Sequence, residues 1–127
     1  MSYVLGVFER KILIRIYGPI CEGEIWRSRY NEELYDLYDE TDLVTTVRIT
    51  SLGWAGHIVR MQDNLPCKKI TLDKPEGRRQ VRRPNLRWMD GAMRDAERLG
   101  VRNWMIKAKD RDGWRRLLEP AKTLHGL

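Results

Sequence analysis

Arginine dominates one short stretch of the chain, residues 77–87, which reads GRRQVRRPNLR. Its five arginines are Arg78, Arg79, Arg82, Arg83 and Arg87. A guanidinium group forms two parallel hydrogen bonds with a phosphate and also stacks on bases, so clustered arginine suits nucleic acid better than lysine does. The stretch therefore predicts phosphate contacts at these five arginines, with three further cations as outer support: Lys68, Lys69 and Lys74.

The stretch lies in a basic loop, residues 74–87, whose other residues help to indicate which kind of partner it binds. Pro84 stiffens the loop and suits the first turn of a following helix, whose N-terminal donors attract one more phosphate. The alternative is a solvated loop that pairs with acidic groups elsewhere in the chain. Arginines this close together repel one another in an unliganded protein, which favours a polyanionic partner.

Charge is divided unevenly along the chain. Residues 1–66 hold 7 lysines and arginines against 10 aspartates and glutamates, whereas residues 67–127 hold 17 against 8. The two parts carry −3 and +9, within a formal net charge of +6. This polarity predicts long-range attraction to RNA or DNA and says nothing about the fold.

Candidate catalytic groups are scattered. Metal-dependent phosphoryl transfer needs converging carboxylates, and the nearest arrangement is Asp36, Asp39 and Asp42, whose spacing could place them on one helix face. Helix capping and solubility explain such residues more often. His57 and His125 have no metal ligands beside them in the sequence, and no serine or cysteine lies in a recognisable nucleophile motif. We expect no enzymatic activity, no metal and no cofactor.

Length and composition fit a small basic protein with a core of its own. The 127 residues make one domain or part of one, and 42% of them are hydrophobic while 33% are charged. Cys21 and Cys67 lie far apart without CxxC spacing, which predicts two free thiols in a reducing compartment. No apolar stretch approaches the roughly 18 residues of a membrane helix, and charged residues interrupt any signal-like segment. We expect an intracellular protein without membrane contact.

The elements that must position the basic loop are predicted to be helices. Apolar residues spaced by three and four predict a helix over residues 3–17, and Asn31 is expected to cap a short helix. Residues 20–30 fit either a hairpin or an irregular loop. Further helices are expected to start at Thr41 or Asp42, Pro66, Pro84, Asn103 and Asp110. The fold class predicted is all-α, with five to seven short helices.

Interruptions within these helices carry further expectations. Gly100 should end the helix that starts at Pro84, and Pro120 should kink or truncate the last helix. Gly53 and Gly56 predict a bend or the close approach of a neighbouring segment. The helix that starts at Thr41 or Asp42 is expected to face the core with the apolar stripe Leu43, Val47, Trp54, Ile58 and Met61, with Val44, Ala55 and Val59 beside it.

The five tryptophans divide into two groups. Trp26 is followed by two nearby arginines and is the one expected to be exposed. The other four lie on apolar stripes of predicted helices and are expected in the core rather than on a base-stacking surface: Trp54, Trp88, Trp104 and Trp114.

Six sequence blocks occur in order: FERKILIRIYGPI, WRSRYNEELYDLY, LGWAGHIVRM, GRRQVRRPNLRWMD, LGVRNW and AKDRDGWRRLLEPAK. Together they resemble the C-terminal region of the reverse transcriptase polyprotein of non-LTR (LINE-like, RTE-type) retrotransposons, over nearly the whole chain. The resemblance implies that residues 1–20 are the end of the polymerase thumb. It implies that residues 21–127 form a helical tail domain that contains the basic loop.

Family enzymes copy their RNA into DNA at a nicked chromosomal site. The resemblance therefore implies a tail that holds template RNA or target DNA in the nucleus, alongside the remainder of a reverse transcriptase. The family's polymerase motif, an aromatic residue followed by two aspartates, has no match here, and neither does its endonuclease, so polymerisation is not expected. Two other hypotheses stay open, a helical protein-interaction module and a non-functional remnant of a decayed element.

The chain also departs from the family's pattern. The family tends to have Gly-Arg-Pro where this chain has Arg82-Arg83-Pro84, an arginine at Gly53 and a residue other than proline at Pro120. These differences indicate a decayed or a diverged copy of such an element.

Overall fold

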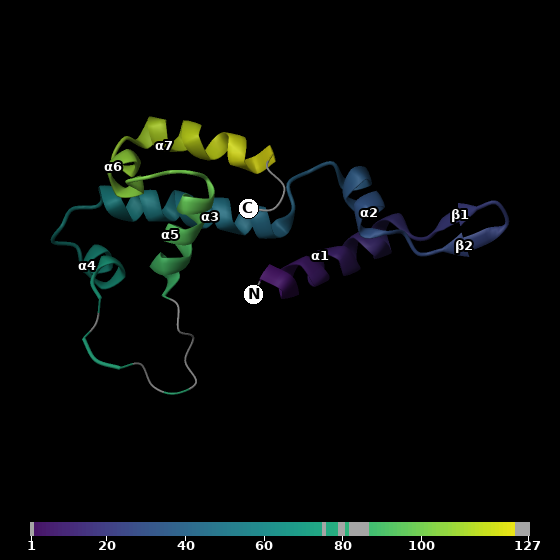
Figure 1. The fold of residues 1–127 in the computed structure, drawn as a ribbon, viewed down its shortest axis with the longest axis horizontal. Helices are drawn as coiled ribbons and strands as arrows, with labels where there is room; N and C mark the ends of the chain where they lie inside the picture. The colour runs from purple at the N-terminus through teal and green to yellow at the C-terminus, as the bar shows by residue number, and fades with distance from the viewer. Residues whose placement is uncertain (1, 75, 79–80, 82–86, 124–127) are drawn as a thin grey trace. The chain divides into compact units, whose positions relative to one another are not determined.

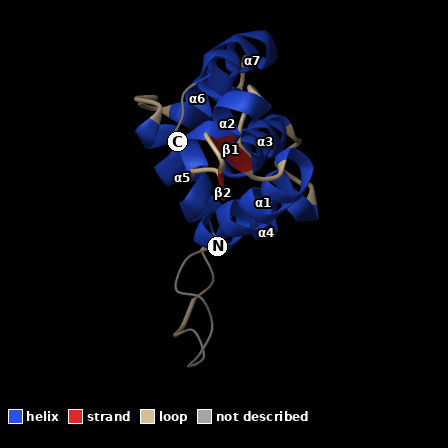
Figure 2. Cartoon of the chain, turned by 90° about the vertical axis from the view of Figure 1, so that its right-hand side faces the viewer, coloured by secondary structure: helices blue, strands red, loops and turns tan. Residues whose placement is uncertain are grey.

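The computed structural model describes residues 2–74, 76–78, 81 and 87–123. The chain forms two compact units, Met1–Val47 and Arg48–Leu127, which we call unit 1 and unit 2. The described residues contain seven α-helices, one 3-10 helix and one two-stranded antiparallel sheet (Figures 1 and 2). The fold is therefore mainly helical, and the all-α prediction is corrected by the small sheet. Within these described segments, every helix is too short or too polar to cross a lipid bilayer.

Unit 1 begins with a helix and a hairpin. It contains α1 (Ser2–Tyr17), β1 (Ile20–Glu22), β2 (Ile25–Arg27), α2 (Asn31–Tyr38) and the first residues of α3 (Leu43–Arg60). Gly18 ends α1 with a left-handed φ of 67°, and its N–H bonds to the Ile14 carbonyl at 2.9 Å. The strands pair with Cys21 opposite Trp26. Of the two alternatives for residues 20–30, the hairpin is the one present.

Two helix starts in unit 1 test the capping predictions. The residue that caps α2 is Tyr30, one position before the predicted Asn31. The carboxylate of Glu33 decides this boundary, because its Oε2 accepts the Tyr30 N–H at 2.7 Å. Asp42, one of two predicted starts for the next helix, accepts the Thr45 N–H through Oδ2 at 3.4 Å. That prediction is confirmed.

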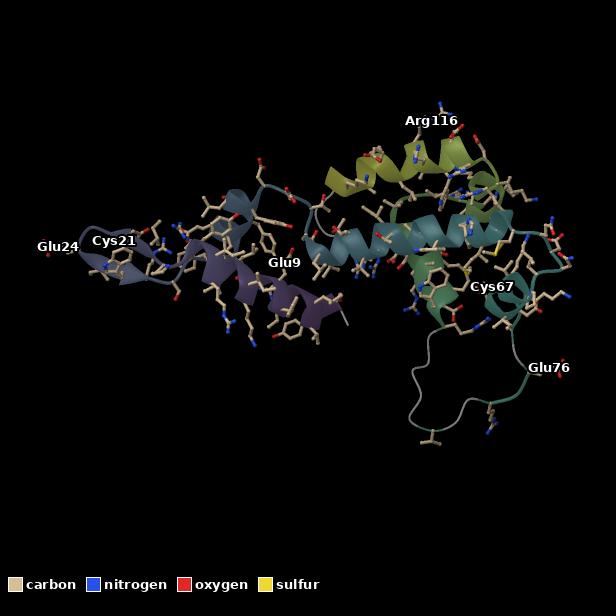
Figure 3. The ribbon with its side chains drawn as sticks, turned by 180° about the vertical axis from the view of Figure 1, so that it is seen from behind. Glu9, Cys21, Glu24, Cys67, Glu76 and Arg116 are labelled. Carbon is tan, nitrogen blue, oxygen red and sulfur yellow. The ribbon has the colours of Figure 1, made fainter. Side chains whose placement is uncertain are left out.

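The interior of unit 1 is small and partly polar. Its buried side chains include Leu13 and Leu34, but also Glu9, which is 7% exposed. Glu9 accepts the Leu43 N–H at 2.9 Å and the Tyr35 hydroxyl at 3.0 Å, so one carboxylate joins α1, α2 and the start of α3 (Figure 3). Burial and the hydrogen bond to Glu9 raise the pKa of Tyr35.

Unit 2 is built on the remainder of α3. It continues with α4 (Pro66–Leu72), α5 (Trp88–Arg98), α6 (Trp104–Ala108), α7 (Arg111–Leu118) and the 3-10 helix η1 (Glu119–Thr123). Helix α7 runs alongside α3 in the opposite direction (Figure 1). One apolar cluster draws on α3, α5, α6 and α7: Ile49, Leu52, Ala55, Val59, Met89, Ala92, Ala96, Val101, Trp104, Ala108, Trp114, Leu118 and Ala121.

The face that α3 turns to the core matches the predicted stripe only in part: Ile58 is buried, as predicted, and so are Ala55 and Val59, which were expected beside the stripe. Val47 and Trp54 are 43% and 58% exposed, whereas Leu52 and Ala55 are fully buried. Apolar residues occur nearly all around α3, so periodicity alone defines more than one stripe. The glycine at position 56 decides between them, because a Cβ there would stand 2.5 Å from Trp114 Nε1. The predicted close approach is thus confirmed at Gly56 but not at Gly53, where a Cβ would meet nothing within 4 Å.

The helix ends of unit 2 follow the predictions closely. Gly100, with φ 72°, follows α5, its N–H bonds to the Glu97 carbonyl at 2.9 Å, and the Val101 N–H bonds to the Ala96 carbonyl at 3.1 Å. This pair of bonds is the Schellman arrangement. Helix α7 ends at Leu118 and continues as η1, which contains Pro120, so the predicted truncation is confirmed. The predicted start of the helix at Pro84 is wrong, because α5 begins at Trp88 and Arg87, in an extended conformation, is its N-cap residue. Pro84 itself lies outside the described residues.

Candidate nucleic-acid interface

The lysines before the basic loop lie on α4 and have different surroundings. Lys68 donates from Nζ to the carbonyls of Val59 and Met61, both at 2.9 Å, and to Asp63 Oδ1 at 2.6 Å. A cation in this place satisfies the last carbonyls of α3 and opposes the helix dipole. The hydrogen bond from Lys68 lowers the pKa of Asp63. Lys68 therefore has an intramolecular role that the sequence prediction did not foresee.

Arg87 stands at the other end of the loop and is also engaged. Its Nη2 donates to the Thr71 carbonyl at 3.0 Å and to the Asp73 carbonyl, which joins the end of α4 to the residue before α5. Its backbone N–H donates to Asp90 Oδ2 at 3.1 Å, so a first-turn carboxylate caps α5. Arg87 closes the base of the loop and brings its two ends together.

The remaining predicted contacts are on the surface or outside the described residues. Lys69, Lys74 and Arg78 are exposed. Of the tip of the loop, the structure describes Val81, which is 92% exposed. Three predicted contacts, like Pro84, lie outside the described residues: Arg79, Arg82 and Arg83.

A second basic feature of unit 2, absent from the sequence prediction, lies between α3 and α7. Trp114 donates from Nε1 to the Leu52 carbonyl at 3.0 Å and packs on Gly56. This contact holds α7 close to α3. A groove of about 500 Å³ lies beside the contact. We call it the α3–α7 groove, and it is lined by Thr50, Gly53, Trp54, His57, Arg60 and Arg111.

The groove continues into an adjoining hollow of about 260 Å³ toward the end of α7. The two hollows share Gly53, Arg60 and Arg111. Four cationic residues line the pair of hollows against one carboxylate, Glu119: Arg60, Arg111, Arg115 and Lys122. The Arg60 Nη1 donates to the Ala108 carbonyl at 2.6 Å, and Lys122 is paired with Glu119 at 3.0 Å.

The aromatic wall of the groove comes from α3. The Trp54 and His57 rings meet edge to face, with centroids 5.6 Å apart and an interplanar angle of 81°. Sequence reasoning placed Trp54 in the core because it fits a helical stripe. The observation that could have corrected this was the pair of glycines around it, since one of them, Gly56, marks the side of α3 that α7 approaches.

Of the other four tryptophan predictions, three are confirmed and one is wrong. Trp104 and Trp114 are buried, as predicted, and their rings lie 6.2 Å apart. Trp26 is 68% exposed, also as predicted, whereas Trp88 is 47% exposed and so is not a core residue. Trp88 is the first residue of α5.

The scattered catalytic candidates do not converge in the described structure. Asp36 lies within α2, Asp39 follows its end and Asp42 precedes α3. No group of three or more His, Cys, Asp and Glu residues in the described segments could hold a metal ion. Cys21 and Cys67 are exposed free thiols, as predicted.

Comparison with known proteins gives one informative match. The chain is 31% identical over 106 residues to an uncharacterized transposon-derived protein of Caenorhabditis elegans. The match covers 79% of this chain but 38% of the relative, so the chain spans well under half of that protein's length. No protein family model matches the chain, and no solved structure matches it. The similarity fits a transposon origin.

Proposed function

We propose that this chain binds RNA or DNA through unit 2, as the C-terminal tail of a retrotransposon-type reverse transcriptase, without a polymerase site of its own. The observation that carries the proposal is the charge of the two units. Unit 2 has 19 lysines and arginines against 9 aspartates and glutamates, a balance of +10, whereas unit 1 has 5 against 9, a balance of −4. A folded unit this basic attracts polyanions and releases their counterions on binding.

The base of the loop supports a role in presenting these charges. Arg87 ties the end of α4 to the start of α5, so both ends of the basic loop leave from one fixed place. Lys74 and Arg78 follow that place and are exposed. The similarity to a transposon-derived protein supports a transposon origin. In such an element the tail would hold template RNA or target DNA in the nucleus, beside the rest of a polymerase.

Salt dependence of binding tests this function. Binding of the full chain to labelled single-stranded RNA, duplex DNA and an RNA–DNA hybrid is measured at several salt concentrations. The plot of log K against log salt should flatten by about 0.9 for duplex DNA, and by about 0.7 for single strands, for every phosphate that a variant no longer neutralises. We expect K74Q/R78Q to flatten the slope by the equivalent of one to two phosphates. K11Q/R15Q, which removes two exposed charges of unit 1, is the matched control and should leave the slope unchanged.

Nuclease-treated wild-type protein that binds none of these ligands at low salt would contradict the function. Equal salt slopes for both double variants and the wild type would show that the basic loop takes no part in nucleic-acid binding.

A second candidate function has one specific observation in its favour. Helix α1 exposes apolar residues four apart, with Val4, Phe8 and Ile16 each more than half exposed. Such a stripe is typical of a helix that packs against another protein surface. A stable oligomer free of nucleic acid in light scattering, dissociated by F8S, would favour this protein-interaction module over nucleic-acid binding.

A further inference from the structure

Trp54 lies in an unfavourable position for the stability of the free protein. It is 58% exposed on α3, although burial of a tryptophan side chain is among the largest apolar contributions to stability. The side of α3 that enters the core carries Leu52 and Ala55, so the fold of unit 2 does not use the Trp54 ring as a core residue. The ring instead forms one wall of the α3–α7 groove.

The floor beside this ring is bare. Gly53 lines both hollows, and a Cβ built there would meet nothing within 4 Å. Glycine in a helix costs about 1 kcal/mol relative to alanine, and no neighbour in the described structure requires it at position 53. The groove of about 500 Å³ is an open surface hollow and not an enclosed cavity.

Cations line the groove from the α7 side. Arg111 borders both hollows and Arg115 the second, and both side chains are exposed. The next residue, Arg116, points away from α3 (Figure 3). Neighbouring arginines of this helix therefore serve different surfaces: Arg111 lines the same groove as the exposed tryptophan, and Arg115 lines the hollow that adjoins it.

We propose that the α3–α7 groove holds one unpaired base of a single-stranded nucleic acid, stacked on the Trp54 ring, with adjoining phosphates at Arg111 and Arg115. The proposal rests on the nucleic-acid-binding function above and gives it a second site, separate from the basic loop. An aromatic ring next to cations is the combination by which proteins hold single strands, because every base has a face that stacks.

The same geometry excludes duplex from this site. Away from its ends, a duplex covers both faces of each base with neighbouring base pairs, so an indole at the side of the helix finds no face to stack on. Phosphates of a duplex can still reach Arg111 and Arg115. Loss of the Trp54 ring should therefore separate single-strand binding from duplex binding.

Fluorescence anisotropy with the full chain tests the site. The ligands are labelled 12-nucleotide RNA and DNA single strands of one sequence, and the blunt DNA duplex of that sequence. We expect W54A to weaken single-strand binding about tenfold, within the range measured for base–aromatic stacking, with an unchanged salt slope and unchanged duplex binding. W54F keeps an aromatic face and should remain within about threefold of the wild type.

Two matched comparisons control for fold and charge. W26A removes a tryptophan of similar exposure from unit 1 and should bind like the wild type. R115Q should flatten the single-strand salt slope by the equivalent of about one phosphate, whereas R116Q, its neighbour that points away from α3, should not. G53L fills the groove floor where a Cβ meets nothing, so it should weaken single strands and spare the duplex.

The outcomes separate this site from the general function. A wild-type chain that binds neither single strand nor duplex contradicts the proposed function itself. If the wild type binds both but W54A is within twofold of it on single strands, or loses duplex binding equally, the groove assignment is wrong and the function stands. A tenfold loss on RNA alone or DNA alone supports the site and identifies its ligand.

Discussion

The two units of this protein are held together in different ways. Unit 2 has an apolar cluster that draws on four helices, with Leu52, Ala55 and Ala96 fully buried. Unit 1 buries Leu13 and Leu34 but relies on a carboxylate at its centre and on charged pairs at its edge. Packing energy is non-directional, whereas hydrogen bonds to a buried carboxylate fail as soon as one partner is removed. Unit 1 should therefore depend on single polar atoms, and unit 2 on shape.

Removal of the Glu9 carboxylate is expected to cause the largest loss of stability in unit 1. E9A leaves the Leu43 N–H and the Tyr35 hydroxyl without their acceptor. Both donors are partly buried, and an unsatisfied donor costs up to about 1–3 kcal/mol when it is fully buried. We expect unit 1 to lose about 2–4 kcal/mol, measured by hydrogen exchange of the α1 and α2 amides. E24A, which removes an exposed carboxylate from the hairpin turn, is the control and should change exchange little (Figure 3). Unchanged exchange in E9A would mean that unit 1 is held by packing like unit 2.

Two glycines of α3 test whether the stability of unit 2 depends on close packing. A Cβ at Gly56 would stand 2.5 Å from Trp114 Nε1, whereas a Cβ at Gly53 would meet nothing within 4 Å. Overpacking costs about 1–3 kcal/mol, and alanine returns about 1 kcal/mol of helix propensity. In urea denaturation we expect G56A to destabilise unit 2 by about 1–2 kcal/mol and G53A to stabilise it by about 0.5–1 kcal/mol. A stabilising G56A would show that α7 is not packed tightly on α3.

The elements of both units were largely predictable, because their signals are local. Gly18, Gly100 and Pro120 end helices through their own backbone chemistry, and Pro66 begins one at the predicted residue. The hairpin could not be chosen over a loop, since three-residue strands are too short for a periodic pattern. The boundary at Tyr30 was missed because the carboxylate that fixes it, Glu33, lies three residues further on.

The candidate site was less predictable, because it depends on which side of α3 is covered. Sequence periodicity placed Trp54 in the core, and only the packing of Trp114 on Gly56 shows that the core lies on another side. Likewise, no local pattern reveals that Lys68 and Arg87 donate to main-chain carbonyls. A cation near a helix end can donate to main-chain carbonyls or contact a phosphate, and the tertiary structure decides which of the two it does.

The charged edge of unit 1 gives the smallest expected effect, a dependence on acid pH. Arg27 bonds to Glu33 at 2.7 Å and to Glu22 at 2.6 Å, and its guanidinium lies 4.4 Å from the centre of the Tyr30 ring. The hydrogen bond from Arg27, followed by that from the Tyr30 N–H, lowers the pKa of Glu33 from 4.5 to about 2. Because the folded-state pKa is depressed, the stabilisation is fully present above pH 4.5 and is lost as pH falls through about 2.

We expect the Glu33 carboxyl carbon to titrate in NMR with a midpoint near 2, and the Tyr30 amide to follow it. In R27Q the midpoint should rise toward 4.5, because the largest cause of the shift is removed. A wild-type midpoint already near 4.5 would show that Arg27 does not hold Glu33 in solution. The hairpin and α2 would then be joined by their chain connection and packing, and the contrast between the two units would rest on Glu9 alone.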